Sequence, residues 1–202
     1  MTPIQEALKD YLETASTAFK NPDREFGSFE EFLLKRGKLI ESAPLTKEVA
    51  DDLWGLLRLT TFEIKRCYWN AQQIVHWHDD CQYYEGYALQ AGLIPMHHAW
   101  VVYEGVVVDV TWRPGLHELA GRRSKKTLIR HLTSNASEVA YWGLPVERKK
   151  VRIRYSSRRA GEDFLGDMIR EREEGRRKAL RAAIKGGSGV PVPSHDVGRP
   201  GG

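Results

Sequence analysis

The sequence is poor in cysteine and has no long apolar segment. Only two cysteines, Cys67 and Cys81, occur in 202 residues, which excludes a disulfide-rich secreted scaffold. A disulfide between these two is not expected in a reducing compartment. No apolar run approaches the roughly 20 residues that cross a bilayer, and none lies near the N-terminus as a secretion signal would. These absences predict a cytoplasmic protein without a membrane partner.

A metal-binding pattern is also missing. Residues 76–81 read His-Trp-His-Asp-Asp-Cys, and His76 and Asp80, four residues apart on a helix, could share one face. A metal site needs further ligands at matching spacing, and no second pair accompanies these two. Polar side chains at a helix end are usually solvated. We therefore expect neither a metal nor any other cofactor.

Hydrophobic residues make up 41% of the chain and include six tryptophans, enough for one ordinary core. The charge is unevenly distributed: residues 1–146 carry 16 Lys and Arg against 19 Asp and Glu, whereas residues 147–185 carry 14 against 7. The basic character of the chain therefore belongs to region 147–185. Because this region has few aromatic side chains to stack on bases, a solvated helix is a better interpretation than a nucleic-acid arm.

Hydrophobic periodicity and composition divide the chain into four parts. Residues 1–60 are expected to form an N-terminal helical region packed on the core, and residues 61–160 the core itself. Residues 161–185 are expected to form a basic C-terminal helix. Residues 186–202, rich in Gly, Pro and Ser, are expected to be disordered.

The N-terminal helices are expected at about 3–19, from Ser28 to Leu39, and from Thr46 to Leu57, each opened by a capping residue. Within and after the core, the pattern predicts helices at about 67–79, 124–140 and 162–185. It predicts strands at about 82–89, 97–103, 106–112 and 149–156.

Cys67 is the candidate nucleophile. A cysteine attacks as a thiolate, and a free thiol, with a pKa of about 8.5, is mostly protonated at neutral pH. Cys67 is expected at the N-terminus of a helix, where free backbone N–H groups and the helix dipole favour an anion. Lys65 and Arg66 add positive potential. Cys81 instead follows two aspartates and enters a strand, which predicts a buried structural thiol.

The two strands around Glu104-Gly105 predict a β-hairpin that brings a histidine beside Asp109. With a two-residue loop, Trp100 pairs with Asp109, and His98 lies on the same face as Asp109 and diagonal to it. With a three-residue loop, the register slips by one residue and His97 takes this place. Periodicity leaves both alternatives open.

Several motifs resemble those of the papain-like and transglutaminase-like cysteine enzymes, and most closely a group of poorly characterised phage and bacterial proteins. The motifs are Cys-Tyr-Trp-Asn-Ala at 67–71, Tyr-Glu-Gly-Tyr-Ala at 84–88, His-Ala-Trp at 98–100, Val-Asp-Val-Thr-Trp at 108–112 and Tyr-Trp-Gly-Leu-Pro at 141–145. The resemblance covers about residues 63–145. Val110 departs from it, because the pattern usually has proline there, and this should affect the end of the strand more than the chemistry.

The resemblance implies an α+β fold with a papain-like core, in which a helix bearing cysteine at its N-terminus packs on a short antiparallel sheet. It implies Cys67 as the nucleophile. It selects His98, the histidine directly before Ala-Trp, as the general base and acid. Asp109 would then orient the imidazole and fix its tautomer.

Four further residues are candidates for supporting roles. Asn70 lies one helical turn after Cys67, where it could donate to an oxyanion or stabilise the start of the helix. Glu85 is a candidate for substrate contact. Trp100 and Trp112 could cover the histidine–aspartate pair against water or simply belong to the core.

The implied activity is acyl transfer through an acyl-thioenzyme, on a protein or a small acyl substrate. Hydrolysis by a peptidase or amidase is the first expectation, and transfer to an amine, as in transglutaminases and arylamine acetyltransferases, is the second. Two alternatives belong to other classes: a phage effector that binds a host protein without turnover, and a nucleic-acid binder acting through region 147–185. A phage-encoded protein would act in the cytoplasm of the bacterial host.

Overall fold

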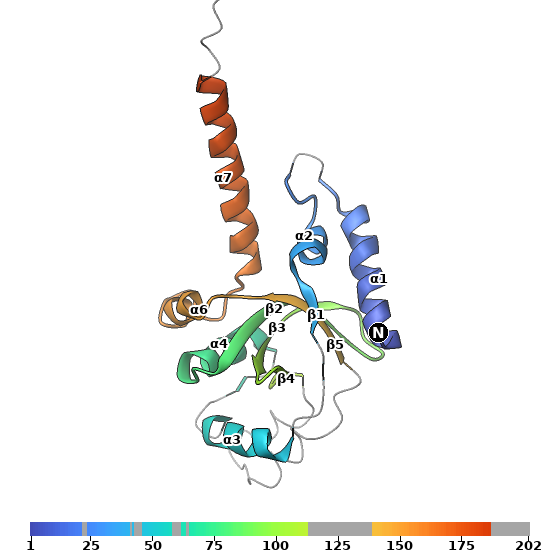
Figure 1. The fold of residues 1–202 in the computed structure, drawn as a ribbon, viewed down its shortest axis with the longest axis vertical. Coiled ribbons are helices and arrows are strands. Elements are labelled where there is room, and N and C mark those ends of the chain that lie inside the picture. The colour runs from blue at the N-terminus through green and yellow to red at the C-terminus, as the bar shows by residue number, and fades with distance from the viewer. Residues whose placement is uncertain are drawn as a thin grey trace, which may run out of the picture.

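The computed structural model describes residues 1–21, 24–40, 42, 46–57, 62–63, 65–112 and 139–186. Its helices are α1 (Pro3–Ala18), α2 (Phe29–Arg36), α3 (Lys47–Leu57), α4 (Cys67–Trp77), α6 (Arg148–Tyr155) and α7 (Leu165–Gly186). Its strands are β1 (Lys38–Ile40), β2 (Cys81–Gln90), β3 (Met96–Tyr103), β4 (Val106–Val108) and β5 (Val139–Pro145). The strands form one curled antiparallel sheet in the order β1-β5-β2-β3-β4 (Figure 1). The fold is therefore α+β, as predicted.

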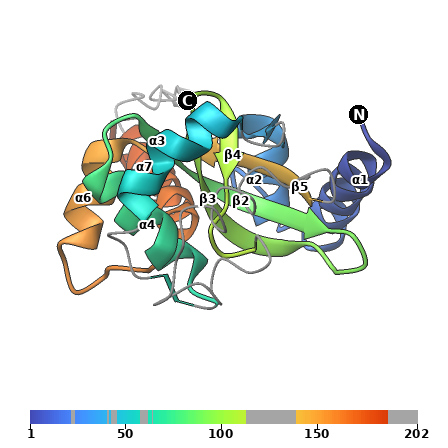
Figure 2. The same ribbon diagram turned by 90° about the horizontal axis from the view of Figure 1, so that it is seen from below.

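The helices pack on one face of this sheet. Tyr83 of β2 packs with α4 in one apolar cluster, and Tyr87, four residues later on the same face, packs with α1 and α2 in another. Figure 2 shows α4 and α6 toward one end of the sheet and α1 and α2 toward the other. The opposite face carries a third cluster, which includes Trp100 and Tyr141. Because side chains alternate along a strand, His98 lies on the face of Trp100.

The hairpin between β3 and β4 has a two-residue loop. Val101 pairs with Val108, and Tyr103 pairs with Val106, which leaves Glu104-Gly105 as the turn. Both turn residues have positive φ, 49° and 81°, as a type I′ hairpin turn requires. The first of the two predicted registers is therefore correct.

The N-terminal region contributes a strand as well as helices. Ser28 caps α2 by accepting a hydrogen bond from the Glu31 N–H at 3.1 Å, as predicted. The helix was expected to continue to Leu39, but it ends at Arg36 with Gly37 as its C-cap, and Leu39 lies in β1 opposite Trp142 of β5. A Cβ at Gly37 would lie 2.7 Å from the Leu33 carbonyl oxygen and 3.0 Å from that of Gly143. The backbone of β5 thus approaches Gly37 too closely for a side chain there.

The predicted strand at 149–156 is wrong, because these residues form helix α6. The alternation of basic and apolar residues resembled a strand, but Val151 is the one fully buried side chain of the helix. Helical geometry places Arg148 and Arg152 one turn apart, so both reach the Asp79 carboxylate. In a strand these two arginines would lie about 13 Å apart.

Strand β5 was not predicted. The expected helix at 124–140 lies outside the described residues except for Val139 and Ala140, which begin β5. The strand pairs with β1 on one side and β2 on the other. At the crossing, Gly86 of β2 stands opposite Gly143 of β5, and a Cβ at Gly86 would lie 2.0 Å from the Trp142 carbonyl oxygen. Two glycines are needed here because the backbones approach too closely for side chains.

The final helix runs to Gly186, the first residue of the expected disordered tail, and residues 187–202 lie outside the described residues. Leu165 at its start is buried and residues 166–169 are half-buried, whereas most later residues are exposed. Figure 1 shows α7 standing out from the sheet and the other helices. In the described part of the chain, no helix combines the length and apolar character needed to cross a membrane.

Candidate active site

Cys67 is the first residue of α4, as predicted. Its side chain is 9% exposed and its thiol is free. The turn before it is unusual, because Lys65 has φ of 62°, a left-handed conformation that costs free energy for any residue except glycine. Arg66 follows this turn and extends its guanidinium to Glu63 at 2.7 Å. The nucleophile candidate is thus presented by a constrained turn at a helix N-terminus.

His98 interacts with Asp109 and is influenced by Cys67. Its Nε2 donates to Asp109 Oδ2 at 2.7 Å, and both side chains are almost fully buried. Cys67 lies near enough to the same imidazole to favour its charged form. Burial alone would lower the pKa of His98, but the Asp109 carboxylate and Cys67 raise it to about 9. At neutral pH this imidazole therefore carries a proton that it can give or take back.

The Asp109 carboxylate is held by four donors. Oδ2 accepts from His98 and from the Tyr141 hydroxyl at 2.9 Å. Oδ1 accepts from the N–H of Thr111 at 2.9 Å and of Trp112 at 3.1 Å. Because these two N–H groups bind the carboxylate, β4 ends one residue before Asp109 rather than at residue 112 as expected. Burial opposes the charge, but the imidazole and the two N–H groups keep the pKa of Asp109 below its ordinary value.

Aromatic rings surround the imidazole. The Trp112 ring stacks on His98 with centroids 4.4 Å apart and planes at 28°. Trp112 therefore covers the histidine, which was one of the two roles predicted for it. Trp100 lies farther from His98, at 6.3 Å, and packs against Tyr141 at 5.0 Å. Trp100 is therefore chiefly a core residue, although its buried indole N–H has no hydrogen-bond partner among the described residues.

Asn70 is buried, and its side-chain amide is fully engaged. Oδ1 accepts from the Glu63 N–H at 2.9 Å, and Nδ2 donates to the Glu63 carbonyl at 2.8 Å and to Thr111 Oγ1 at 3.0 Å. An amide nitrogen has two hydrogens to donate, so neither is free for an oxyanion. The contacts of Asn70 agree with the alternative that it stabilises the start of the helix.

Glu85 and His97 lie on the helix-covered face, away from the imidazole of His98. The Glu85 carboxylate accepts from the N–H groups of Phe164 and Leu165 at 2.7–2.9 Å. It therefore anchors the start of α7 and is not directed toward Cys67. His97 stacks on the Phe29 ring, with centroids 4.3 Å apart. The register excludes His97 from the partnership with Asp109.

The remaining candidate positions are structural. Burial, together with Asp80, raises the pKa of Cys81 to about 12, which is the behaviour predicted for this thiol. Asp79 binds Arg148 and Arg152 of α6. Among the described residues, no group of three or more His, Cys, Asp or Glu side chains is arranged to hold a metal.

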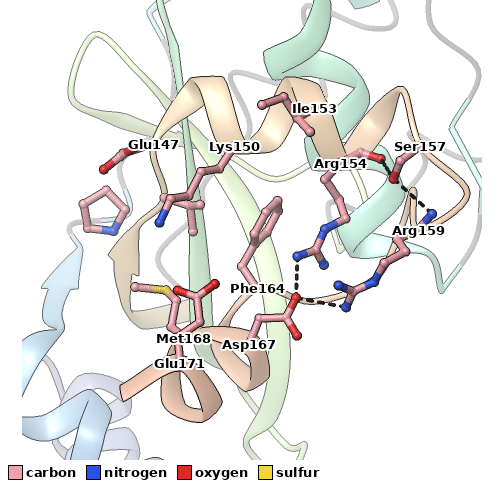
Figure 3. Close-up of a pocket in the computed structure, with 12 residues that line it drawn as sticks. Glu147, Lys150, Ile153, Arg154, Ser157, Arg159, Phe164, Asp167, Met168 and Glu171 are labelled. Atoms are coloured by element: carbon pink, nitrogen blue, oxygen red, sulfur yellow. Dashed lines mark hydrogen bonds and ion pairs between the residues drawn. The ribbon is translucent and has the colours of Figure 1, made fainter. Parts of the chain in front are cut away.

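A pocket of about 450 Å³ lies elsewhere, between α6 and the start of α7 (Figure 3). Phe164, Met168 and Ile153 supply its apolar wall. Figure 3 shows Arg154 and Arg159 converging on Asp167, with N–O distances of 2.5 and 2.9 Å. Several arginines of region 147–185 form ion pairs within the chain: Arg148, Arg152, Arg154, Arg159, Arg170 and Arg172.

Two residues around the site were not assigned roles from the sequence: Tyr141 and Thr111. Both belong to motifs of the resemblance, yet neither carries a group that attacks or transfers a proton in the expected chemistry. Tyr141 reaches Asp109 from β5, a strand that periodicity did not detect. Thr111 bonds Asn70 through its hydroxyl, a contact that depends on how α4 lies against the end of β4.

Comparison with protein-family models, with curated proteins and with solved structures gave no match.

Proposed function

We propose that this protein is a papain-like cysteine enzyme that transfers acyl groups. Hydrolysis of an amide is the favoured reaction, ahead of transfer to an amine. The observation that carries the proposal is the buried His98 imidazole, bonded to the Asp109 carboxylate through Nε2 and interacting with Cys67 at a helix N-terminus. Since Nε2 is occupied by Asp109, Nδ1 is the nitrogen available to the sulfur. A nucleophile, a base and a group that orients the base are the parts that covalent acyl transfer needs.

In the first step, the Cys67 thiolate attacks the acyl carbon and forms a C–S bond. The C–N bond of the substrate then breaks, and the leaving amine takes the proton from His98 Nδ1. Asp109 keeps its hydrogen bond to Nε2 throughout and stabilises the imidazolium before the proton leaves. The backbone N–H groups at the start of α4 would donate to the developing oxyanion, because the Asn70 amide has no free hydrogen.

In the second step, neutral His98 takes a proton from water, and the resulting hydroxide equivalent attacks the thioester carbon. The C–S bond breaks, the acid product leaves, and Cys67 returns as thiolate beside the imidazolium. An amine could replace water and form a new amide. The Trp112 ring over His98 supports either outcome, because it limits access of bulk water to the histidine–aspartate bond.

Acylation by p-nitrophenyl acetate tests this proposal, with intact-mass spectrometry to locate the acetyl group and nitrophenolate release to give the rate. Cys67 should be acetylated and Cys81 should not. His98→Ala should slow acetylation by about 10²–10⁴-fold, the usual contribution of a general base. His97→Ala is the matched control, because the neighbouring ring lies on the other face, and it should keep a rate near that of the wild type.

Cys67→Ser gives the background from other side chains. Equal acetylation of both cysteines, or a His98→Ala variant as fast as the wild type, would show that the cluster is not a catalytic site. Adding methylamine to the preformed acetyl-enzyme then separates the two outcomes. A hydrolase releases acetate at an unchanged rate, whereas an amine acyltransferase releases N-methylacetamide in proportion to the amine.

A further inference from the structure

The turn that presents Cys67 is held by a side chain that follows it in the sequence. Lys65 has φ of 62°, so this turn is not the relaxed path of the backbone. Asn70 is 1% exposed and binds both the N–H and the carbonyl of Glu63, at 2.9 and 2.8 Å. The two bonds close the loop from Glu63 to the first turn of α4 and fix the direction from which the helix starts.

The same amide also connects the turn to Asp109, the carboxylate of the site. The second hydrogen of Asn70 Nδ2 goes to Thr111 Oγ1 at 3.0 Å. The Thr111 N–H in turn donates to Asp109 Oδ1 at 2.9 Å. A continuous path of hydrogen bonds therefore runs from the turn before Cys67 through Asn70 and Thr111 to the carboxylate that holds His98.

Cys67 and His98 come from different elements, so their alignment needs such a connection. Cys67 belongs to the apolar cluster on the helix-covered face of the sheet, whereas His98 is on the opposite face. The bond between Asn70 and Thr111 joins the start of α4 to the segment after β4, where Asp109 binds His98. A displacement of about 1 Å between reacting groups can lower a rate about 100-fold.

We propose that Asn70 and Thr111 are positioning residues that hold the nucleophile in line with the His98–Asp109 pair. This inference rests on the proposed function. Neither residue is expected to touch the substrate, since the amide of Asn70 is saturated and the Thr111 hydroxyl faces that amide. The interaction that matters is the single bond between Nδ2 and Oγ1.

The test removes this bond and keeps the shape of the side chains. Thr111→Val replaces the acceptor by a methyl group, and Thr111→Ser keeps the acceptor. Asn70→Asp keeps the acceptor for the Glu63 N–H but loses both donors. For each variant, alkylation of Cys67 by iodoacetamide is followed from pH 5 to pH 10 by intact mass, together with the melting temperature and the rate of acetylation by p-nitrophenyl acetate.

Thr111→Val and Asn70→Asp should slow acetylation by about tenfold or more. Their alkylation profiles should move to higher pH, toward that of His98→Ala, because the imidazolium no longer faces the sulfur. Thr111→Ser should restore both properties. A merely structural role would lower the melting temperature and leave the pH profile in place, so that result overturns the inference.

Comparing the alkylation profiles of the wild type and His98→Ala distinguishes failure of the positioning role from failure of the proposed function. If their alkylation profiles coincide, His98 does not act on Cys67, and the proposed function fails first. If they differ while the profiles of Thr111→Val and Asn70→Asp match the wild-type profile, the proposed roles of Cys67, His98 and Asp109 stand and the positioning role is wrong. A Thr111→Val chain that does not fold leaves Asn70→Asp to decide, with Thr111→Ser as its folded control.

Discussion

The buried carboxylate of Glu85 should make the stability of the protein depend on pH, and Glu85→Gln should remove this dependence. Glu85 is 1% exposed. It receives the Tyr83 hydroxyl and the N–H groups of Phe164 and Leu165. These contacts connect the middle of the sheet to the start of α7, so the carboxylate anchors this helix to the sheet.

Burial raises the pKa of Glu85 from 4.5 to about 7, although Tyr83 and the two N–H groups oppose the rise. The folded protein therefore binds this proton more tightly than the unfolded chain does. The resulting stabilisation is complete below pH 4.5 and is lost as the pH rises through 7. At about 1.4 kcal/mol per pH unit, the interval corresponds to roughly 3 kcal/mol in the free energy of unfolding.

Urea denaturation at pH 4.5, 6 and 8 measures this effect as the difference between wild type and Glu85→Gln. Relative to the variant, the wild type should lose roughly 3 kcal/mol between the lowest and the highest pH. Tyr83→Phe is the matched control, because it removes one partner and keeps the carboxylate, so its curve should retain the fall. A difference that is constant with pH, or that grows in favour of the wild type at pH 8, would refute the reasoning.

Two further predictions concern the sheet and the aspartate. Gly86→Ala places a Cβ 2.0 Å from the Trp142 carbonyl oxygen and should lower the free energy of unfolding by about 3 kcal/mol or more. Gly175→Ala, on α7 with nothing within 4 Å, should instead raise it by about 0.5–1 kcal/mol; equal losses in thermal denaturation would contradict the close approach at Gly86. Tyr141→Phe removes one donor to Asp109 and should slow acetylation of Cys67 about three- to tenfold, from a net hydrogen bond of about 1 kcal/mol; a wild-type rate would show that the hydroxyl is dispensable.

The hairpin shows how far the sequence alone could go. Alternation located both strands, but Glu104-Gly105 permits either a two-residue or a three-residue loop, and the choice decides which histidine meets Asp109. The structure has positive φ at both turn residues. Glutamate rarely adopts this conformation, so no local rule would have selected it. Pairing of Val101 with Val108 over a buried face outweighs the cost at Glu104.

The wrong predictions for β1 and α6 share another cause: tertiary contacts decide whether a short segment forms a helix or a strand. β1 has three residues and exists because β5 offers it an edge. α6 follows from the reach of Arg148 and Arg152 to Asp79, together with one buried valine. Neither periodicity nor propensity contains this information, since the same residues suit a basic strand equally well.

The residues of the candidate site fall into two physical kinds, and this decides which experiments are most informative. A thiol, an imidazole and a carboxylate are chemically limited choices, so Cys67, His98 and Asp109 can be recognised in a sequence and can also meet by chance in a core. Thr111 and Tyr141 each act through one hydrogen bond that many side chains could provide, and they are in place only because the end of β4 and the strand β5 bring them there. In a chance cluster, loss of such a hydroxyl would cost stability alone. In a site built for chemistry, it should cost acetylation at a melting temperature close to that of the wild type, and so variants of the supporting residues test the function more severely than removal of the nucleophile does.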